Sequence, residues 1–507
     1  MSITVTRQDS RYDTLKKGHN LRWPATEADS VRRIELCDNV ADTAATLQKI
    51  VRAGLRPTVR SGGHCYEDFV SVNPDGVLID LSMLNSMNAA DSGHKYRIDC
   101  GVQLGEAYSA LYKRYGVTLP GGTCYSVAAG GHISGGGYGL LSRLHGLTVD
   151  WLSAIDILTV DRDGQVALRR IDRDHDPDLF RSCRGAGGAN FGIVTSFYFD
   201  DLPKPPQEVV QANMSFSWAD MTPERFEMIL TTYSSFWERR GKDPDTWGLF
   251  SVIVLSHRSA GRFGLSVQFC NPDGSCRDLQ VLNEFLELFH PCKPTVSATS
   301  DAATGSRTAR GQQACWAPQT MTHQLWLDAN VQGGGGGGSR RAKYKSTYMK
   351  KSFTKSEIEC LYKHMTCRMP GINLNSSMVL IDSYGGAINR KEMIEQTAMP
   401  QRASILKLQF ITYWSSSEED AGHLQWISEL YKELYSGPDS DPKYKETPYP
   451  GSRYEGCYIN YPDKDMLAYP YWPSLYYGDG DLYPFLQGVK RHYDPQNIFH
   501  HAMSIRP

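Results

Sequence analysis

Two glycine-rich stretches decide the fold of this chain: residues 60–69, RSGGHCYEDF, and residues 120–143, PGGTCYSVAAGGHISGGGYGLLSR. Each holds one nucleophilic side chain, His64 in the first and Cys124 in the second. Glycine lacks a Cβ, so such backbone can lie flat against a bulky planar ligand and present bare N–H groups to it. Tight turns around a buried cysteine are the alternative, but two nucleophiles in such settings favour a tethered cofactor.

Both stretches resemble those of the covalent-flavin proteins of the vanillyl-alcohol-oxidase superfamily, and within it the berberine-bridge-enzyme-like branch. In that branch the histidine of R-S-G-G-H is bonded to the flavin 8α-methyl, and the cysteine of G-x-C to flavin C6. The resemblance covers essentially the whole chain and continues through residues 80–87, 146–161, 178–197, 458–463 and 493–507. A narrower likeness, through VRSGGHCYEDF, GGGYGLLSR, AMPQR and HHAMSIRP, is to the bacterial hexose oxidases of glycopeptide-antibiotic biosynthesis.

The resemblance implies FAD attached twice, as 8α-histidyl at His64 and 6-S-cysteinyl at Cys124. Loss of one link should leave the flavin held by the other, and loss of both should give a largely apo protein. The double link also leaves room for an open site, which suits bulky substrates. The cofactor-binding residues that the resemblance implies are Arg60, Ser61, Gly62, Gly63, His64, Gly122, Cys124, Val127, Gly131, His132, Gly135, Gly137, Gly192, Val194, Tyr458 and Asn460.

Three tyrosines are the candidates for acid–base chemistry. Tyr458, in YINYPD, matches the family tyrosine that deprotonates a substrate hydroxyl while hydride passes to flavin N5. A phenol has a pKa near 10, so it acts as a base only where neighbours stabilise the phenolate. Tyr384, in IDSYGGAIN, is the expected helper by family position, and Tyr138, in GGGYG, is the second candidate.

Other residues are assigned to the substrate, to oxygen or to structure. Asp382 and Trp414 are interpreted as lining the sugar site, Trp414 as a stacking platform, with ordinary packing as the alternative. We interpret His132 as a flavin-contacting or structural histidine. The third residue after the bicovalent cysteine resembles an oxygen gate in this branch, and Val127 favours an oxidase; Ala128 departs from the family's usual glycine.

The resulting hypothesis is an FAD-dependent oxidase of a hydroxyl on a sugar or glycosylated natural product, with O2 as acceptor and H2O2 as product. The alternatives are oxidative cyclisation or dehydrogenation of a non-sugar natural product, and a non-catalytic flavin-binding protein. No H-E-x-x-H, P-loop or G-x-S-x-G motif occurs, and the polyglycine run lacks the βαβ context of a dinucleotide fingerprint. We see no cluster with metal-ligand spacing and predict no metal.

Composition sets the broad class of the protein. The chain has 507 residues with 54 Lys and Arg against 56 Asp and Glu, a net charge of −2 that favours neither nucleic acid nor a membrane surface as partner. No stretch approaches the ~18 apolar residues of a membrane span, and the first residues lack a secretory signal pattern. We therefore expect a cytoplasmic monomer or homodimer that acts on a small molecule. The 12 cysteines are scattered and expected to be free, with Cys270–Cys276 or Cys360–Cys367 as the alternative pairings.

The fold class predicted is α+β, in two domains built from three segments. Residues 1–206 alternate strands and amphipathic helices, including a hairpin around Asp163 and Gly164. The prolines of LPKPPQEV mark a boundary, after which residues 207–450 predict a sheet covered by helices on one side. The resemblance implies an FAD-binding domain, an antiparallel-sheet substrate domain, and a C-terminal segment, 451–507, that returns to the FAD-binding domain.

One low-complexity segment, the run from Gly333 to Gly338, is followed closely by a basic string. We interpret the two together as a flexible, solvated surface loop. The alternative is a mobile lid whose cations hold an acidic or phosphorylated substrate group. The basic string consists of Arg340, Arg341, Lys343, Lys345, Lys350 and Lys351.

Overall fold

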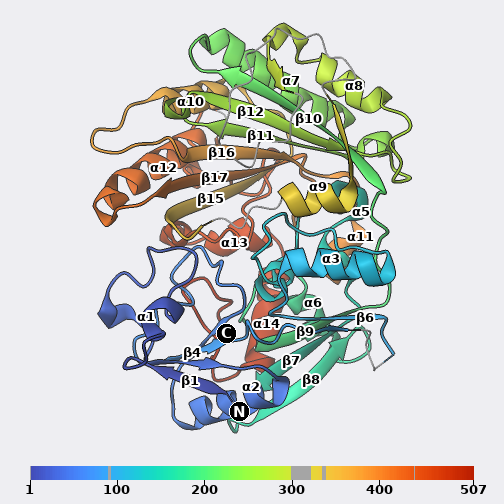
Figure 1. The fold of residues 1–507 in the computed structure, drawn as a ribbon. Helices are drawn as coiled ribbons and strands as arrows, with labels where there is room; N and C mark the ends of the chain where they lie inside the picture. The colour runs from blue at the N-terminus through green and yellow to red at the C-terminus, as the bar shows by residue number, and fades with distance from the viewer. Residues whose placement is uncertain (1, 89–92, 298–320, 334–337, 439) are drawn as a thin grey trace.

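The computed structural model describes residues 2–88, 93–297, 321–333, 338–438 and 440–507. Figure 1 shows two halves: two smaller sheets lie in one, and a large sheet covered by helices forms the other. The red C-terminal segment returns to the half that contains the N-terminus. The predicted α+β architecture with a helix-covered antiparallel sheet is confirmed, while the division at residues 206 and 450 stays a prediction.

The first small sheet has the strand order β1-β2-β4-β3. β2, β4 and β3 run parallel, and parallel neighbours require a crossover, which α2 provides between β2 and β3. The His64 stretch begins at the last residue of β3, so this sheet fixes where it starts. The bounds are β1 Ile3–Thr6, β2 Arg33–Leu36, α2 Val40–Arg52, β3 Pro57–Arg60 and β4 Val77–Asp80.

The second small sheet, in the order β5-β6-β9-β7-β8, is antiparallel throughout. β7 and β8 form the predicted hairpin, and Gly164 takes a φ of 74° in its turn. Its strands are β5 Met87–Asn88, β6 Tyr96–Asp99, β7 Ala154–Val160, β8 Val166–Asp172 and β9 Ile193–Phe199. The helices of this half include α1 Tyr12–Leu15, α3 Leu104–Tyr115, α4 Ala129–Ser134, α5 Ser142–His145 and α6 Pro177–Cys183.

The large sheet has the order β13-β10-β12-β11-β16-β17-β15, with β14 paired to β10, and its pairings are antiparallel. Its strands are β10 Glu208–Ser217, β11 Leu249–Ser256, β12 Arg262–Phe269, β13 Thr295–Ser297, β14 Thr322–Leu325, β15 Arg341–Met349, β16 Ser377–Ser383 and β17 Leu406–Trp414. Figure 1 shows helices on its outer side: α7 Pro223–Arg240, α8 Gln280–Glu287, α10 Lys355–Thr366 and α12 Asp420–Leu434. Further helices are α9 Trp326–Gly333, α11 Glu392–Gln396, α13 Trp472–Tyr477 and α14 Leu482–Tyr493.

Strand alternation divides the side chains of β17 between the two faces of this sheet. Successive side chains of a strand point to opposite faces, and Phe410 packs its ring 5.2 Å from that of Tyr431 on the outer helix α12. Lys407, Gln409 and Ile411 alternate with Phe410 along the strand, so their side chains point to the opposite, inner face, where they line a cavity. The inner face of the sheet therefore forms one wall of this cavity.

The structure corrects the interpretation of the basic string as a solvated loop. Arg341–Met349 is strand β15, and Lys343 and Lys345 are only 3% and 2% exposed. Their charges are matched by carboxylates from distant parts of the chain, which a local charge pattern cannot reveal. Gly334 to Gly337 lie outside the described residues.

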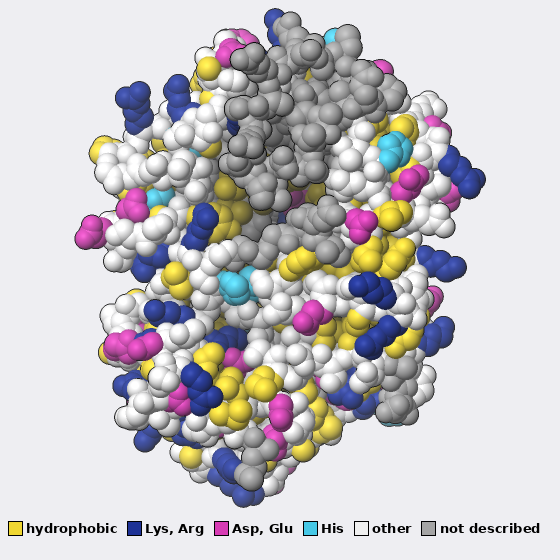
Figure 2. All heavy atoms as spheres, viewed as in Figure 1, with side chains coloured by type: hydrophobic (Ala, Val, Ile, Leu, Met, Phe, Trp, Pro, Cys, Tyr) yellow, Lys and Arg dark blue, Asp and Glu magenta, His cyan; other side chains and the backbone are white. Residues whose placement is uncertain are grey.

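The surface agrees with the near-neutral composition. On the face shown in Figure 2, basic and acidic side chains are interspersed over both halves. Among the described residues, no helix combines the length and the apolar character needed to cross a bilayer. The cysteines in the described part of the chain, Cys270, Cys276, Cys360 and Cys367 included, are free thiols.

Buried histidines make the stability of this fold depend on pH. Burial lowers the pKa of His132 and His257 to about 4, and that of His501 to about 3, from 6.5. Between those values and 6.5 the unfolded chain binds more protons than the folded one, so the free energy of unfolding falls as the pH drops through this window. We expect the melting temperature to fall as the pH is lowered from 6.5 to 4. In His257→Gln the melting temperature should depend less steeply on pH. A melting temperature that does not change from pH 7 to 4 would refute this.

Candidate active site

A cavity of about 870 Å³ lies between the two halves and is lined from both. His64 and Cys124 both line it, so the two nucleophiles face one space. The opposite wall carries residues of β11, β15, β16 and β17, together with residues 459–462. The volume is in the range of cofactor and ligand pockets.

Most of the predicted cofactor-binding residues line this cavity, and three do not. Gly137, at a φ of 75°, packs against Thr148, while Gly135 and Tyr458 lie behind the wall. Those that line it are Arg60, Ser61, Gly62, Gly63, His64, Gly122, Cys124, Val127, Gly131, His132, Gly192, Val194 and Asn460.

The glycines keep the floor of the cavity open. A Cβ added at Gly131 or Gly188 would project into empty space, and both residues line the cavity. A Cβ at Gly62 would instead lie 2.6 Å from the backbone nitrogen of Ala128, because the two glycine-rich stretches touch there. At Gly131 and Gly188 the floor therefore carries no side chain that would keep a ligand away from the backbone.

The His64 imidazole is positioned as a neutral nucleophile. Its ring stacks on His19 at 3.7 Å between centroids, and Nε2 lies 3.0 Å from Ser126 Oγ. Burial, and secondarily the charge on His19, lowers the pKa of His64 to about 4, so the ring keeps a free lone pair at neutral pH. The Arg60 guanidinium holds the start of the stretch through Asp80, at 2.9 Å from Nε to the carboxylate.

His132 supports the Cys124 stretch through a hydrogen bond to its backbone. Its Nε2 accepts a hydrogen bond of 3.1 Å from the N–H of Gly122, two residues before Cys124. Burial lowers the pKa of His132 to about 4, which keeps Nε2 in the unprotonated form that accepts this bond.

Asn460 joins the C-terminal segment to the glycine-rich floor. Its Nδ2 donates to the carbonyl of His132 at 2.9 Å and to Tyr458 Oη at 3.1 Å. Gly135 makes this possible, because a Cβ there would lie 2.0 Å from Asn460 Oδ1.

We therefore expect Gly135→Ala to displace Asn460 and to break its hydrogen bond to His132. Overpacking of this kind lowers the free energy of unfolding by about 1–3 kcal/mol. Thermal unfolding measures this, and Gly131→Ala is the matched control for stability, since its Cβ meets nothing within 4 Å. Equal melting temperatures for the Gly135 variant and the parent protein would refute it.

The structure places Tyr461, and not Tyr458, on the cavity wall. The N–H of Tyr461 donates to the carbonyl of Tyr458 at 2.9 Å and closes a turn, with the two rings 4.9 Å apart. Tyr458 is only 3% exposed and its hydroxyl is engaged by Asn460, whereas Tyr461 lines the cavity. The motif therefore supplies two tyrosines, of which the second one, Tyr461, faces the cavity.

Lys407 and Asp382 stand beside Tyr461. Lys407 Nζ lies 2.8 Å from Asp382 Oδ2 and 3.5 Å from Tyr461 Oη, and it sits 4.5 Å from the centre of the Tyr138 ring. Asp382 and Lys407 both line the cavity, as expected for Asp382. Burial, and after it the charge of Asp382, raise the pKa of Tyr461 well above its ordinary value.

The other predicted substrate residues are placed differently. Tyr138 lines the cavity, but its hydroxyl donates to the carbonyl of Ser383 at 2.6 Å. Tyr384 is fully buried, donates to the carbonyl of Gln401 at 3.1 Å and does not line the cavity. The structure corrects the prediction that Trp414 lines the sugar site. Trp414 follows Tyr413 on β17, so its side chain lies on the outer face of the sheet, stacked on His423 at 4.7 Å between ring centroids.

Six residues of the wall were missed in the sequence, and four of them form one group around Tyr66. Tyr66 stacks on Tyr344 at 3.5 Å between centroids, Tyr413 lies edge-on to Tyr344, and Gln409 Nε2 donates to Tyr66 Oη at 3.1 Å. The residues missed are Tyr66, Tyr344, Gln409 and Tyr413, besides Tyr461 and Lys407. In KLQFITY, residues 407–413, one strand phase holds Lys407, Gln409 and Tyr413, with Ile411 as its one aliphatic member, and this was the available signal.

A buried charge cluster ties both walls together. Lys343 Nζ contacts Glu67 at 2.7 Å and Asp463 at 2.6 Å, and Lys345 Nζ contacts Asp463 and Asp465, each at 2.6 Å. Glu67 follows His64 by three residues, and Asp463 follows Tyr461 by two. Strand β15 thus anchors the segments that carry the nucleophile and the cavity tyrosine.

Comparisons with known proteins agree with this geometry. Residues 32–167 match the FAD binding domain family, and residues 457–506 match the family described as berberine and berberine like. The chain is 33% identical to hexose oxidase of Chondrus crispus, covering 99% of this chain and 94% of the relative. It is 32% identical to aclacinomycin-N/aclacinomycin-A oxidase of Streptomyces galilaeus, covering 100% and 90%.

A solved structure shares the whole fold. The crystal structure of the glycopeptide hexose oxidase DBV29 complexed with teicoplanin has a TM-score of 0.86 and 33% identity, covering 100% of this chain and 99% of that one. Two relatives and this structure match the chain over its full length at more than 30% identity. Both family models match segments that build the cavity, and these two findings together assign the family. The chain belongs to the berberine-bridge-enzyme-like family and is an FAD-dependent oxidoreductase.

Proposed function

We propose that this protein oxidises a hydroxyl group of a sugar or glycosylated natural product in secondary metabolism, with O2 as acceptor and H2O2 as product. The observation that carries the proposal is the cavity itself, which has the two nucleophiles and the glycine floor on one wall and Tyr461, Lys407 and Asp382 on another. The hexose and glycopeptide relatives support the sugar class.

The glycine floor fits FAD, and His64 and Cys124 are proposed to bond it as 8α-histidyl and 6-S-cysteinyl links. Bound FAD supplies hydride acceptance at N5 and electron transfer to oxygen. Open space over Gly131 and Gly188, and the unprotonated His64 ring, support this assignment. Val127, which lines the cavity, is proposed to leave O2 access.

Tyr461 is proposed to take the proton of the substrate hydroxyl. The phenolate is the active form, and Lys407, 3.5 Å from its oxygen, stabilises it. Asp382 holds Lys407 in place at 2.8 Å, and the Tyr66 and Tyr344 rings, which stack on each other, add apolar surface to the wall that a pyranose ring would meet. Since burial raises the pKa of Tyr461, we propose that turnover rises with pH on the alkaline side.

Denaturing mass spectrometry with peptide mapping tests the cofactor attachment. A flavin-sized mass increase on peptides containing both His64 and Cys124 is expected. His64→Ala and Cys124→Ala should each keep the flavin through the other link, and the double variant should be largely apo. A wild-type protein without any flavin adduct would overturn the covalent assignment.

A substrate panel followed by peroxide release tests the reaction. Free hexoses, oligosaccharides and glycosylated natural products, each with its matched aglycone, are compared under air. Turnover only with the sugar-bearing member of each pair supports the proposal. Equal turnover of an aglycone would instead favour dehydrogenation or cyclisation of a non-sugar natural product, and flavin loading with no reduction by any member would favour a non-catalytic flavin-binding protein.

A further inference from the structure

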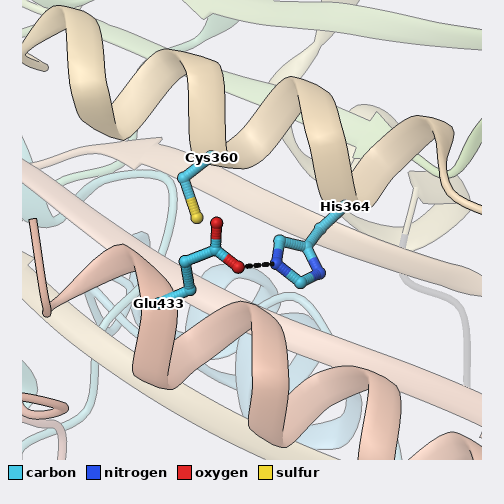
Figure 3. A group of neighbouring side chains, drawn as sticks. All are labelled: Cys360, His364 and Glu433. Carbon is cyan, nitrogen blue, oxygen red and sulfur yellow. Dashed lines mark hydrogen bonds and ion pairs between the residues drawn. The ribbon is translucent and has the colours of Figure 1, made fainter.

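A second group of reactive side chains lies on the other side of the large sheet from the cavity. Cys360 and His364 stand four residues apart on α10, and Glu433 reaches them from α12 (Figure 3). Their donor atoms lie within 4.8 Å of one another, and His364 Nε2 is 2.9 Å from Glu433 Oε2. Cys360 and His364 are only 7% and 6% exposed, so packing of the two helices fixes their positions.

The donor set has the chemistry of a zinc site. Residues four apart on a helix share one face, and thiolate, imidazole and carboxylate are the ligands that Zn²⁺ prefers in tetrahedral geometry. Ordinary Zn–ligand distances place neighbouring donors about 3.4–3.6 Å apart. The present separations need only small side-chain shifts to reach that value.

An entry path and a fourth position are also present. His364 and Glu433 line a cleft of about 430 Å³ between the helices, together with Cys367 and Ser436. A metal ion can enter there, and water can complete the coordination. Glu433 is half exposed at the mouth of this cleft, where a carboxylate moves at low cost.

Lys363 is the competing partner of Glu433. Its Nζ lies 2.7 Å from both carboxylate oxygens, but its side chain is 63% exposed and can swing into solvent. A cross-helix ion pair would make Lys363 the main partner of Glu433, whereas a metal site makes it a rival cation. The two interpretations predict opposite effects of removing its charge.

We propose that Cys360, His364 and Glu433 form a binding site for a divalent cation with the ligand preferences of Zn²⁺, which ties α10 to α12. On binding, the thiol proton of Cys360 leaves to solvent as the S–Zn bond forms, and no oxidation state changes. This revises the prediction of no metal, which sequence spacing favoured because Glu433 comes from a different helix. The site lies on the other side of the large sheet from the cavity and takes no part in the redox reaction.

The test uses the full flavin-loaded chain, treated with chelator under a non-chelating reductant and then titrated with Zn²⁺ against a chromogenic chelator. One equivalent is expected to bind. Cys360→Ser and His364→Ala should each weaken binding at least about tenfold, the loss that even outer-shell partners cause. Cys276→Ser, which removes an equally buried thiol, should not change it.

Lys363→Met separates the two interpretations. The metal site predicts several-fold tighter Zn²⁺ binding, because a rival positive charge is removed, and Co²⁺ should give tetrahedral d–d bands at wavelengths beyond the flavin absorption. Thermal unfolding and flavin content check that each variant is folded, and Glu433→Gln, for which the same weakening is expected, replaces any variant that is not. The proposal is overturned by an absence of Zn²⁺ binding, by full-strength binding in both ligand variants, or by unchanged or weaker binding in Lys363→Met.

Discussion

Replacing Tyr461 by phenylalanine is expected to lower the turnover number by about 10²–10⁴-fold, the usual contribution of a positioned general base. The change removes one oxygen atom from the cavity wall, next to Lys407, and leaves the ring that packs against Tyr66 at 5.4 Å. Flavin content and melting temperature should therefore stay near those of the parent protein. Stopped-flow reduction of the flavin under anaerobic conditions isolates this step.

Tyr458→Phe is the matched control for Tyr461→Phe. Tyr458 belongs to the same turn, but its hydroxyl accepts a bond from Asn460 and does not line the cavity. We expect this variant to lose about 0.5–1.5 kcal/mol of stability for one hydrogen bond and to keep most of its turnover. The reverse pattern, with the larger kinetic loss in Tyr458→Phe, would assign the base to Tyr458, as the motif alone suggests.

The pH dependence gives a second check on Tyr461. Because the phenolate is the proposed active form and burial raises the pKa of this phenol, the reduction rate should still be rising with pH at neutral pH. Lys407→Met removes the positive charge beside the oxygen and should shift the rise to higher pH. A pH-independent rate in the parent protein would contradict a titrating phenol.

Local sequence patterns identified those parts of the site that lie within one segment. His64 and Cys124 each stand in a glycine run whose spacing is visible in the chain, and both line the cavity. The hairpin at Gly164 and the helix-covered sheet also follow from residues near each other in sequence. In these cases the physical cause, a turn or a repeating face, is itself local.

Features that depend on distant segments were misread or missed. Lys343 and Lys345 look like a solvated charge run until Asp463, more than a hundred residues away, is placed beside them. Trp414 was chosen for its ring, but strand phase puts it on the face opposite Gln409. Tyr461 was overlooked beside Tyr458, because the motif does not tell which end of the turn faces the ligand.

Removal of one lysine from the buried charge cluster should have the largest effect on stability. Lys345→Met leaves Asp463 and Asp465 with Lys343 alone, and breaking a buried ion pair from one side costs about 3–5 kcal/mol. Lys351→Met is the matched control, since that side chain is 54% exposed and its pair with Glu238, at 3.6 Å, contributes about 0–1 kcal/mol. Urea unfolding of the two variants measures the difference.

A double variant shows whether charge, and not packing, causes this loss. The double variant Lys345→Met with Asp465→Asn removes the cation and one of the carboxylates that it neutralises. This double variant should therefore be more stable than Lys345→Met alone. If the double variant is instead less stable by the sum of the single losses, the two charges are not coupled.

Because the cluster joins the segments after His64 and Tyr461, Lys345→Met should also reduce the fraction of protein with covalently bound flavin, and Lys351→Met should not. Loss of stability with full flavin attachment would limit the cluster to holding the two halves together.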